Sequence, residues 1–267
     1  MDSLTLGGAC SALFAVASER REAPVAAHGL IDTTEMYLRT VFELTEEGIV
    51  PLRARIAERL SQSGPTVSET VARMKRDGLL TVIDNRRLSL TDEDLRLATR
   101  VMRKHRLAEC LLVDVIGLPW EEVHIEACRW EHVISDSVER RLADLLHYPV
   151  RCPHGNVIPG LAELDVPEVA IEGAEAAAQE PDQAMTAIAT AEPVHVTIQR
   201  ITEQLQSDAA LMLKLKKIGI QPGREVTVSA GVDDVQVTSS GTDGGSPDVS
   251  AALPIDIAAH VFVVETS

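Results

Sequence analysis

The sequence predicts a mainly α-helical protein with a winged helix-turn-helix domain, a helical metal-binding domain and a C-terminal SH3-like small β-barrel. Three observations lead to this fold class. Two short amphipathic segments flank a glycine-containing turn and precede two strand-like segments. A long helical stretch follows, with metal-ligand side chains at helical spacing. Beyond an acidic segment, the pattern becomes short strands bounded by turn residues.

Length and composition set limits on the class of protein. The 267 residues exceed one typical core and suggest two or three domains. Residues 1–28, rich in Ala, Gly and Ser, are predicted to be a disordered extension or to precede the true start. No apolar run reaches a membrane span, and the four cysteines are widely spaced without a CxxC pair. We therefore expect a protein of the reducing cytoplasm, with no membrane partner.

Charge is distributed unevenly along the chain. The formal net charge is -16, yet residues 32–106 hold 14 Lys and Arg against 12 Asp and Glu, which leaves 11 against 29 elsewhere. The field near a binding surface matters more than the total charge when the partner is a polyanion. A nucleic-acid partner is therefore compatible with this acidic chain.

The first domain, expected over 29–99, begins with a helix in TTEMYLRTVFELTEEG, which has a Thr N-cap and ends at Gly48. The helix-turn-helix and wing are expected as helices at 52–60 and 65–77 and strands at 79–83 and 88–90. Small polar groups at the start of the second helix can reach base edges and phosphates, and its basic end can hold the backbone. The expected DNA-binding residues are Arg53, Ser63, Pro65, Thr66, Ser68, Glu69 and Arg73. A helical hairpin without a nucleic-acid role is the alternative for this segment alone.

The second domain, expected over 100–165, carries candidate metal ligands. His124, Cys128, Glu131 and His132 share one helical stripe, and His105 and Glu109 form a second pair one turn apart. Mixed N, O and S ligands suit Fe, Mn, Co, Ni or Zn better than Mg2+ or Ca2+. The alternative is a set of hydrogen-bonded histidines, a buried thiol and solvated carboxylates. Burial of six such groups without a partner would cost about 1 to 3 kcal/mol each, which favours a metal.

The remaining chain is expected to form a linker and a barrel. Residues 166–192 are rich in Ala, Pro and acidic residues, contain no Lys or Arg, and are predicted not to order. The segment 193–267 reads strand, helix, strand, strand and strand, and is predicted to be an SH3-like (FeoA-like) domain. This fold serves many functions, so it does not indicate one by itself.

Five motifs between about 30 and 160 resemble the diphtheria toxin repressor family of iron-dependent regulators: IDTTEMYLRT, RIAERLSQSGPTVSETVARMKRDGLL, VMRKHRLAE, EACRWEHV and GNVIPGL. The resemblance implies a homodimeric, metal-activated transcriptional repressor that binds a palindromic double-stranded DNA operator. It implies two metal sites per subunit, no small-molecule substrate and no enzymatic activity. A dimer surface is expected among the apolar runs of the second domain, such as LLVDVIGL.

The resemblance also assigns site residues. It implies a regulatory metal site made of Met36, Cys128, Glu131 and His132. It implies an ancillary site made of His105, Glu109, His124 and, from the barrel, Asp208, although Leu211 stands where the family has an amide. It implies an anion pocket made of Arg106, Cys152 and Asn156, with Cys152 in place of a serine.

Metal choice and base readout are the points left open. The soft ligands Met36 and Cys128 favour Fe2+ over Mn2+, and Co2+, Ni2+ or Zn2+ are expected to substitute in vitro. Glu69 stands where the family has a glutamine that contacts a base. Either the carboxylate changes the operator sequence that is recognised, or Glu69 is a solvated helix residue without a role in base readout. The alternatives are a Mn2+-responsive regulator of the same family, a constitutive metal-stabilised DNA-binding protein and, most distantly, a metallohydrolase. No general base stands outside the ligand set, which disfavours the hydrolase.

Overall fold

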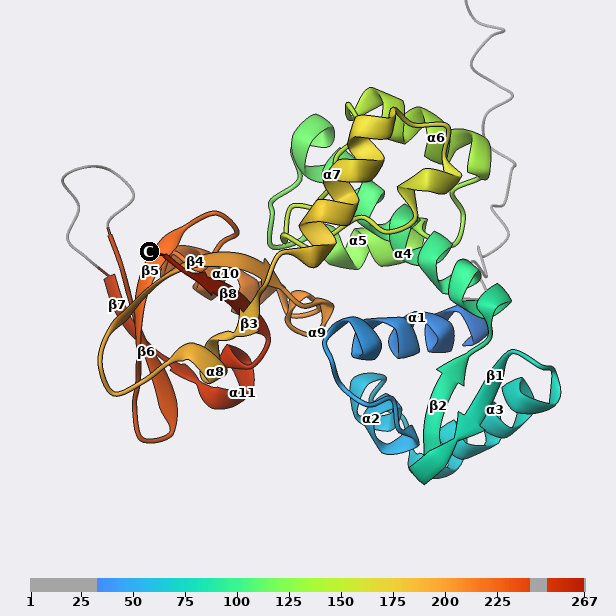
Figure 1. Cartoon of the computed structure of the whole chain (residues 1–267), viewed down its shortest axis with the longest axis horizontal. Coiled ribbons are helices and arrows are strands. Elements are labelled where there is room, and N and C mark those ends of the chain that lie inside the picture. The colour runs from blue at the N-terminus through green and yellow to red at the C-terminus, as the bar shows by residue number, and fades with distance from the viewer. Residues whose placement is uncertain (1–32, 241–248, 267) are drawn as a thin grey trace, which may run out of the picture. The chain divides into compact units, whose positions relative to one another are not determined.

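The computed structural model describes residues 33–240 and 249–266 (Figure 1). The predicted disordered extension at 1–28 lies outside these residues. The first described part contains helices and strands in the order α1 (Thr33–Glu46), α2 (Arg53–Arg59), α3 (Gly64–Arg76), β1 (Leu80–Ile83) and β2 (Arg87–Leu90). The two strands pair antiparallel around a single 3-10 turn. This is the predicted winged helix-turn-helix.

The start and the face of α3 follow from its sequence. The Ser63 hydroxyl accepts a hydrogen bond from the Thr66 N–H at 3.3 Å, and Pro65 occupies the first turn, where its missing N–H costs nothing. The buried residues of α3 recur at helical spacing, at Val67, Val71 and Met74. They pack against α1 residues in one core, so the opposite face of α3 is left exposed.

The helical domain is built around one long helix. It comprises α4 (Asp92–Leu111), a π-helical turn at Leu112–Ile116, α5 (Val123–Trp130) and α6 (Asp136–Leu145). The Thr91 hydroxyl caps α4 by accepting from the Asp94 N–H, and Gly117, at φ +79°, ends the π turn. α4 packs on both α1 and α5, so it joins the winged helix directly to the helices that carry the metal ligands.

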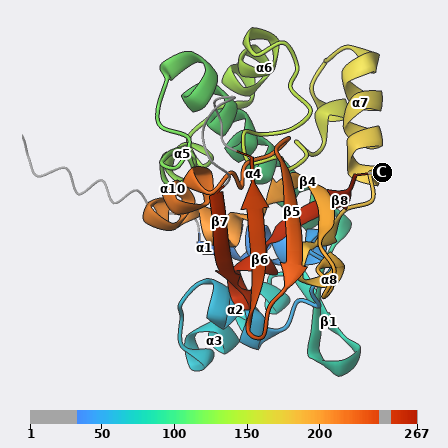
Figure 2. The same ribbon diagram turned by 90° about the vertical axis from the view of Figure 1, so that its left-hand side faces the viewer.

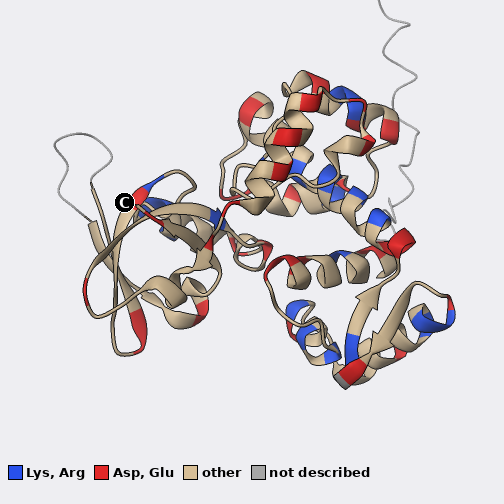
Figure 3. Ribbon diagram, in the orientation of Figure 1, with Lys and Arg blue, Asp and Glu red and all other residues tan. Residues whose placement is uncertain are grey.

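The segment 166–192 is ordered, which contradicts the predicted linker. It contains α7 (Glu168–Gln179), the short strand β3 (Gln183–Ala184) and one turn of helix, α8 (Met185–Ile188). Ala170, Ala174 and Ala177 recur at i, i+4 and i+7 and are buried, and α7 lies against the helical domain (Figure 1). Acidic residues occupy its other faces (Figure 3). Small alanine side chains let α7 pack closely against the domain and cost little side-chain entropy. The prediction from acidic and Ala/Pro-rich composition did not take this alanine face into account.

The C-terminal domain is a six-stranded antiparallel sheet in the order β3-β8-β4-β5-β6-β7, with β5, β6 and β7 seen face-on in Figure 2. Its remaining elements are β4 (Val194–Ile201), α9 (Glu203–Gln206), α10 (Ala209–Lys217), β5 (Glu225–Ala230), β6 (Asp234–Ser239), β7 (Val249–Pro254), α11 (Ile255–Ala258) and β8 (Val261–Glu265). Met185 is fully buried in its core, so the domain begins near Gln183 rather than at the predicted 193. The predicted β domain is otherwise confirmed, and β7, α9 and α11 are additions.

A glycine allows the sheet domain to approach the helical domain. Gly155 has φ +87°, and a Cβ there would lie 1.9 Å from the Gln199 carbonyl oxygen on β4. The backbone N–H of Ile201 donates to the His154 carbonyl at 2.9 Å in the same region. This close approach positions the loop 152–156 between the two domains. Within the part of the chain described here, no helix is both long and apolar enough to cross a membrane.

Candidate metal centre and nucleic-acid interface

Helices α4 and α5 bring four expected metal ligands together. α4 supplies His105 and Glu109 one turn apart, and α5 supplies His124 and Cys128 in the same way. The rings of His105 and His124 meet edge to face, with their centroids 4.8 Å apart. One ligand atom from each of His105, His124 and Cys128 lies within 4.8 Å of the others. The space between the helices is therefore lined by imidazole, thiol and carboxylate groups.

Glu109 is the central carboxylate of this group. Its Oε1 lies 3.0 Å from His105 Nε2, 3.5 Å from His124 Nδ1 and 3.2 Å from His154 Nδ1. Burial alone would raise the pKa of Glu109, but the facing imidazoles of His154 and His105 lower it well below its usual range. Glu109 is therefore an anion in a fully buried position, and such a charge is stable only beside cations.

A basic side chain that the sequence did not single out lies among the regulatory residues. Arg39 Nη1 is 3.2 Å from Cys128 Sγ and 2.8 Å from Glu131 Oε2. Burial would raise the pKa of both acidic groups, but this guanidinium lowers that of Cys128 well below the usual thiol value and that of Glu131 to about 2. Arg39 thus favours the anionic forms of both Cys128 and Glu131. Arg39 lies one turn after Met36, and that spacing was the available signal.

His132 connects the end of α5 to α1. Its Nδ1 lies 2.6 Å from Glu35 Oε2, and its Nε2 lies 3.2 Å from Glu131 Oε1. Met36 follows Glu35 on α1 and packs partly buried against the winged-helix core. Arg39 thus contacts both Cys128 and Glu131, and His132 contacts Glu131. Met36 is the neighbour in sequence of Glu35, the carboxylate that contacts His132. Glu35 is a second residue of this region that sequence reasoning missed.

The sheet domain contributes different residues from those expected. Asp208 is exposed, and its Oδ1 caps α10 by accepting from the Leu211 N–H at 2.9 Å, so Asp208 does not lie in the ancillary group. Glu203 and Gln206 on α9 are buried instead and supply a carboxylate and an amide three residues apart. α9 packs against α5. The signal was the sequence ITEQLQ at the end of β4, five residues before the position chosen.

Several buried polar atoms around these helices lack a hydrogen-bond partner among the described residues. They include Glu109 Oε2, His124 Nδ1 and Gln206 Oε1. All three are atoms with lone pairs available to a cation, or become so in the appropriate tautomer. Unpaired burial of such atoms costs about 1 to 3 kcal/mol each, which a coordinated divalent ion removes. The donor set therefore fits a transition metal.

Arg106 occupies the predicted anion pocket in an unexpected way. It is fully buried, and its Nη2 lies 2.6 Å from Glu46 Oε2 and 2.7 Å from Glu203 Oε1. Burial would raise the pKa of Glu203, but Arg106 lowers it to about 2. Asn156 donates from Nδ2 to the Ile201 carbonyl at 2.8 Å. An external anion here would compete with two carboxylates, and the pocket stays a prediction.

The exposed face of α3 carries most of the residues that the sequence predicts to contact DNA. Exposed side chains there are Ser63, Pro65, Thr66, Ser68, Glu69 and Arg73. Arg53, at the start of α2, is half-buried. Lys and Arg mark α2 and the end of α3 in Figure 3, with Arg73, Lys75 and Arg76 in the last turn of α3. The face combines small polar groups with flanking cations, as a helix that enters the major groove requires.

Two family models match adjacent segments of the chain. The iron dependent repressor N-terminal DNA binding domain matches residues 29–88. The iron dependent repressor metal binding and dimerisation domain matches residues 91–160. Together they cover the winged helix and the helices that carry the ligands.

Characterised relatives and solved structures resemble the chain over most of its length. The iron-dependent repressor IdeR of Mycobacterium tuberculosis is 58% identical over 200 residues, which are 74% of this chain and 84% of that protein. The diphtheria toxin repressor of Corynebacterium glutamicum is 50% identical over 238 residues, 88% and 97% of the two chains. A manganese-dependent transcriptional repressor in complex with manganese has a TM-score of 0.69 at 28% identity, over 87% of this chain and all of that one. ScaR with bound Zn2+ has a TM-score of 0.67 at 27% identity, over 87% of this chain and 99% of that one.

Proposed function

The chain belongs to the iron-dependent repressor family, so we propose that it is a transcriptional repressor activated by Fe2+ that controls genes of iron homeostasis. As a member of that family it is a metal-dependent DNA-binding repressor that forms dimers, and it is not an enzyme. A palindromic operator, and residence in the cytoplasm with the DNA, belong to the proposal. The observation that carries the choice of Fe2+ is the thiolate of Cys128 among imidazole and carboxylate ligands, a softer set than Mn2+ prefers.

Two ligand sets are proposed for the divalent ions. Cys128, Glu131, His132 and Met36 form the regulatory set. His105, Glu109, His124, Glu203 and Gln206 form the ancillary set, with the last two replacing Asp208. A bound divalent ion would supply the charge that balances the clustered carboxylates and thiolate. Arg39 supplies part of that charge to Cys128 and Glu131, so it must withdraw when the regulatory ligands turn to an ion.

The coupling to DNA runs through α1. This helix carries Glu35 and Met36 beside the regulatory set, and its Tyr37, Leu38 and Val41 lie in the core that holds α3. A shift of α1 therefore moves the recognition helix as well. In a dimer, two such helices must match half-sites one DNA turn, about 34 Å, apart. Metal binding that holds α1 in one position would favour this separation of the two recognition helices over others.

The proposed dimer surface includes exposed apolar side chains of the helical domain. They are Val115, Ile116, Ile125 and Val133, which are 41% to 78% exposed. Exposed apolar side chains that gather on one surface favour an interface with another protein surface. The family model of this segment, which includes dimerisation, supports the same assignment.

An anaerobic DNA-shift titration on a genomic fragment library tests the function. We expect chelator-treated protein to bind specific fragments with Fe2+ and to release them when chelator returns. Mn2+ is expected to require a higher concentration, because its preferred ligands are harder than Cys128. Stronger activation by Mn2+ than by Fe2+ would favour a manganese regulator, and binding that ignores both ions would favour a constitutive DNA-binding protein.

The composition of the ancillary set gives a second prediction. Gln206→Ala is expected to weaken binding at one of the two sites by about tenfold or more, because it removes a buried amide oxygen from the set. Asp208→Ala, which changes an exposed cap only a few residues away, is the matched control and should leave both affinities unchanged. Competition between the protein and a fluorescent chelator for Co2+ measures both. Equal effects of the two variants would restore Asp208 to the ancillary set.

A further inference from the structure

One nitrogen atom of Arg39 contacts three donor atoms of the proposed regulatory set. Nη1 lies 3.2 Å from Cys128 Sγ, 2.9 Å from Glu131 Oε1 and 2.8 Å from Glu131 Oε2. The side chains of Arg39 and Glu131 are 12% and 1% exposed, so little water screens the contact between them. A single positive group thus holds a sulfur and both oxygens of a carboxylate, as charge-assisted hydrogen bonds do most strongly.

The guanidinium and a metal ion cannot hold these atoms at the same time. A divalent transition metal binds a thiolate sulfur at about 2.3 Å and a carboxylate oxygen at about 2.0 to 2.2 Å. An ion at those distances from Cys128 and Glu131 would overlap Arg39 Nη1 or lie directly beside it as a second positive charge. Occupancy by Arg39 and occupancy by an ion are therefore mutually exclusive.

We propose that Arg39 is a tethered competitor of the regulatory ion, and that exchange between its guanidinium and the ion sets the metal concentration at which this site fills. The inference rests on the regulatory ligand set proposed above. A resident cation lowers the apparent affinity of the site, because only the fraction of molecules in which it has left can bind an ion. The same cation keeps Cys128 and Glu131 paired when no ion is bound, so neither is left as a buried charge without a partner.

Glu43 is the anion that remains for the displaced guanidinium. It follows Arg39 by one turn of α1, and its Oε1 already accepts from Arg39 Nε at 2.6 Å. Its Oε2 lies 3.5 Å from Arg59 Nη1, whereas Arg59 makes two contacts of 2.8 Å with Glu47. The second oxygen of Glu43 is therefore weakly held and available. Arg39 can leave Cys128 without becoming a buried charge that lacks a partner.

The test measures the Co2+ affinity of full-length protein stripped of metal, in anaerobic competition with a chelator and without DNA. The signal is the near-ultraviolet band of thiolate-to-Co2+ charge transfer that disappears in Cys128→Ala, so it reports the regulatory set. Arg39→Gln removes the competing charge and should lower the Co2+ concentration at half-saturation about tenfold or more. Arg55→Gln is the control, because Arg55 is 56% exposed and pairs with Glu58 at 3.1 Å, and it should leave the midpoint unchanged.

Glu43→Gln gives a prediction of the opposite sign, and it keeps Arg39 in place if Arg39→Gln fails to fold. Without an anion to receive the guanidinium, the Co2+ midpoint should rise about threefold or more. The same Glu43→Gln change in the Arg39→Gln background should have no effect, because no guanidinium has to be received. A general change of the electrostatic field would instead shift the midpoint by the same factor in both backgrounds, which would overturn the proposal.

Other results would also decide against exchange. An unchanged or higher midpoint after Arg39→Gln, or an unchanged or lower midpoint after Glu43→Gln, would each show that Arg39 does not compete with the ion. Absence of any Cys128-dependent band would overturn the regulatory ligand set itself, and this inference with it. Metal-dependent DNA binding is measured separately, so failure of the repressor function and failure of the exchange are distinguishable.

Discussion

Cys128→Ala is expected to abolish Fe2+-dependent DNA binding at metal concentrations that saturate the unaltered protein. The thiolate is one of two anionic groups in the proposed regulatory set, and its loss removes both a soft donor and a charge. Removal of a group that only orients a ligand costs about 10-fold to 100-fold in metal affinity, so loss of the ligand itself should cost on the order of 100-fold or more. A DNA-shift titration against free Fe2+ measures the displacement of the midpoint.

Two further variants separate coordination from folding. Cys110→Ala changes a buried thiol on α4 that lies outside both proposed ligand sets, and should leave the Fe2+ midpoint unchanged. Cys128→Asp replaces sulfur with oxygen and should restore DNA binding with Mn2+ in preference to Fe2+. If Cys128→Ala responds to Fe2+ like the unaltered protein, Cys128 is not a regulatory ligand.

Glu139→Ala should destabilise the helical domain by about 3 to 5 kcal/mol, the cost of a buried charge whose partner is removed. Arg103 Nε lies 2.7 Å from Glu139 Oε1, and the two side chains are 2% and 1% exposed. Arg103 would keep its hydrogen bond to the Gly160 carbonyl and an ion pair with half-exposed Glu163, but not its buried counter-charge. Urea denaturation of metal-free protein measures the change in the free energy of unfolding.

The control for this prediction lies on the same helix. Asp136, three residues before Glu139 on α6, pairs with Arg100 and Lys104 but is 48% exposed, so Asp136→Ala should cost less than about 1 kcal/mol. Replacement of Arg103 and Glu139 together by Met and Leu should recover most of the loss, because no unpaired charge is left. Equal costs for Glu139→Ala and Asp136→Ala would show that the buried pair is not critical.

Local sequence signals predicted the parts of the fold that local interactions determine. The Ser63 cap, Pro65 and the spacing of Val67, Val71 and Met74 fix α3 without reference to the rest of the chain. The stripe on α5 was predictable for the same reason, because helical spacing alone puts His124 and Cys128 on one face.

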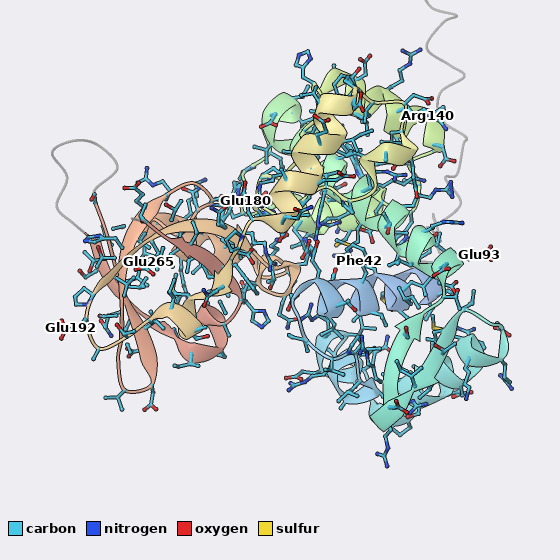
Figure 4. The ribbon with its side chains drawn as sticks, viewed as in Figure 1. Phe42, Glu93, Arg140, Glu180, Glu192 and Glu265 are labelled. Carbon is cyan, nitrogen blue, oxygen red and sulfur yellow. The ribbon has the colours of Figure 1, made fainter. Side chains whose placement is uncertain are left out.

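Tertiary contacts decided what the sequence did not show. Glu203 is buried because Arg106, 97 positions earlier, neutralises it, and no local pattern encodes that pairing. The order of α7 depends on an alanine face that finds a complementary surface. Arg39 reads as an ordinary surface residue of an amphipathic helix, and only the approach of α5 gives it two anionic neighbours. Phe42, which is labelled in Figure 4, also lies on α1. The Phe42 side chain lines a pocket together with residues of the 157–162 segment and of α7, a further contact between distant parts of the chain.

The order of α7 has a consequence for the strength of metal chelation. Arg151 donates to the Ala177 carbonyl at 2.9 Å and pairs with Glu180 at 2.8 Å, so the end of α7 is attached to the helical domain just before β3 begins. A long flexible linker in place of α7 would lower the effective concentration of Glu203 and Gln206 near α4 and α5. The ordered α7 leaves only a short connection and so keeps that effective concentration high. The entropy of bringing these donors to the other ligands is then lost during folding, not during ion capture. With the ligand sets proposed above, the chain would act as a preorganised multidentate chelator. Substitutions that loosen α7 would then lower metal affinity without altering any proposed ligand.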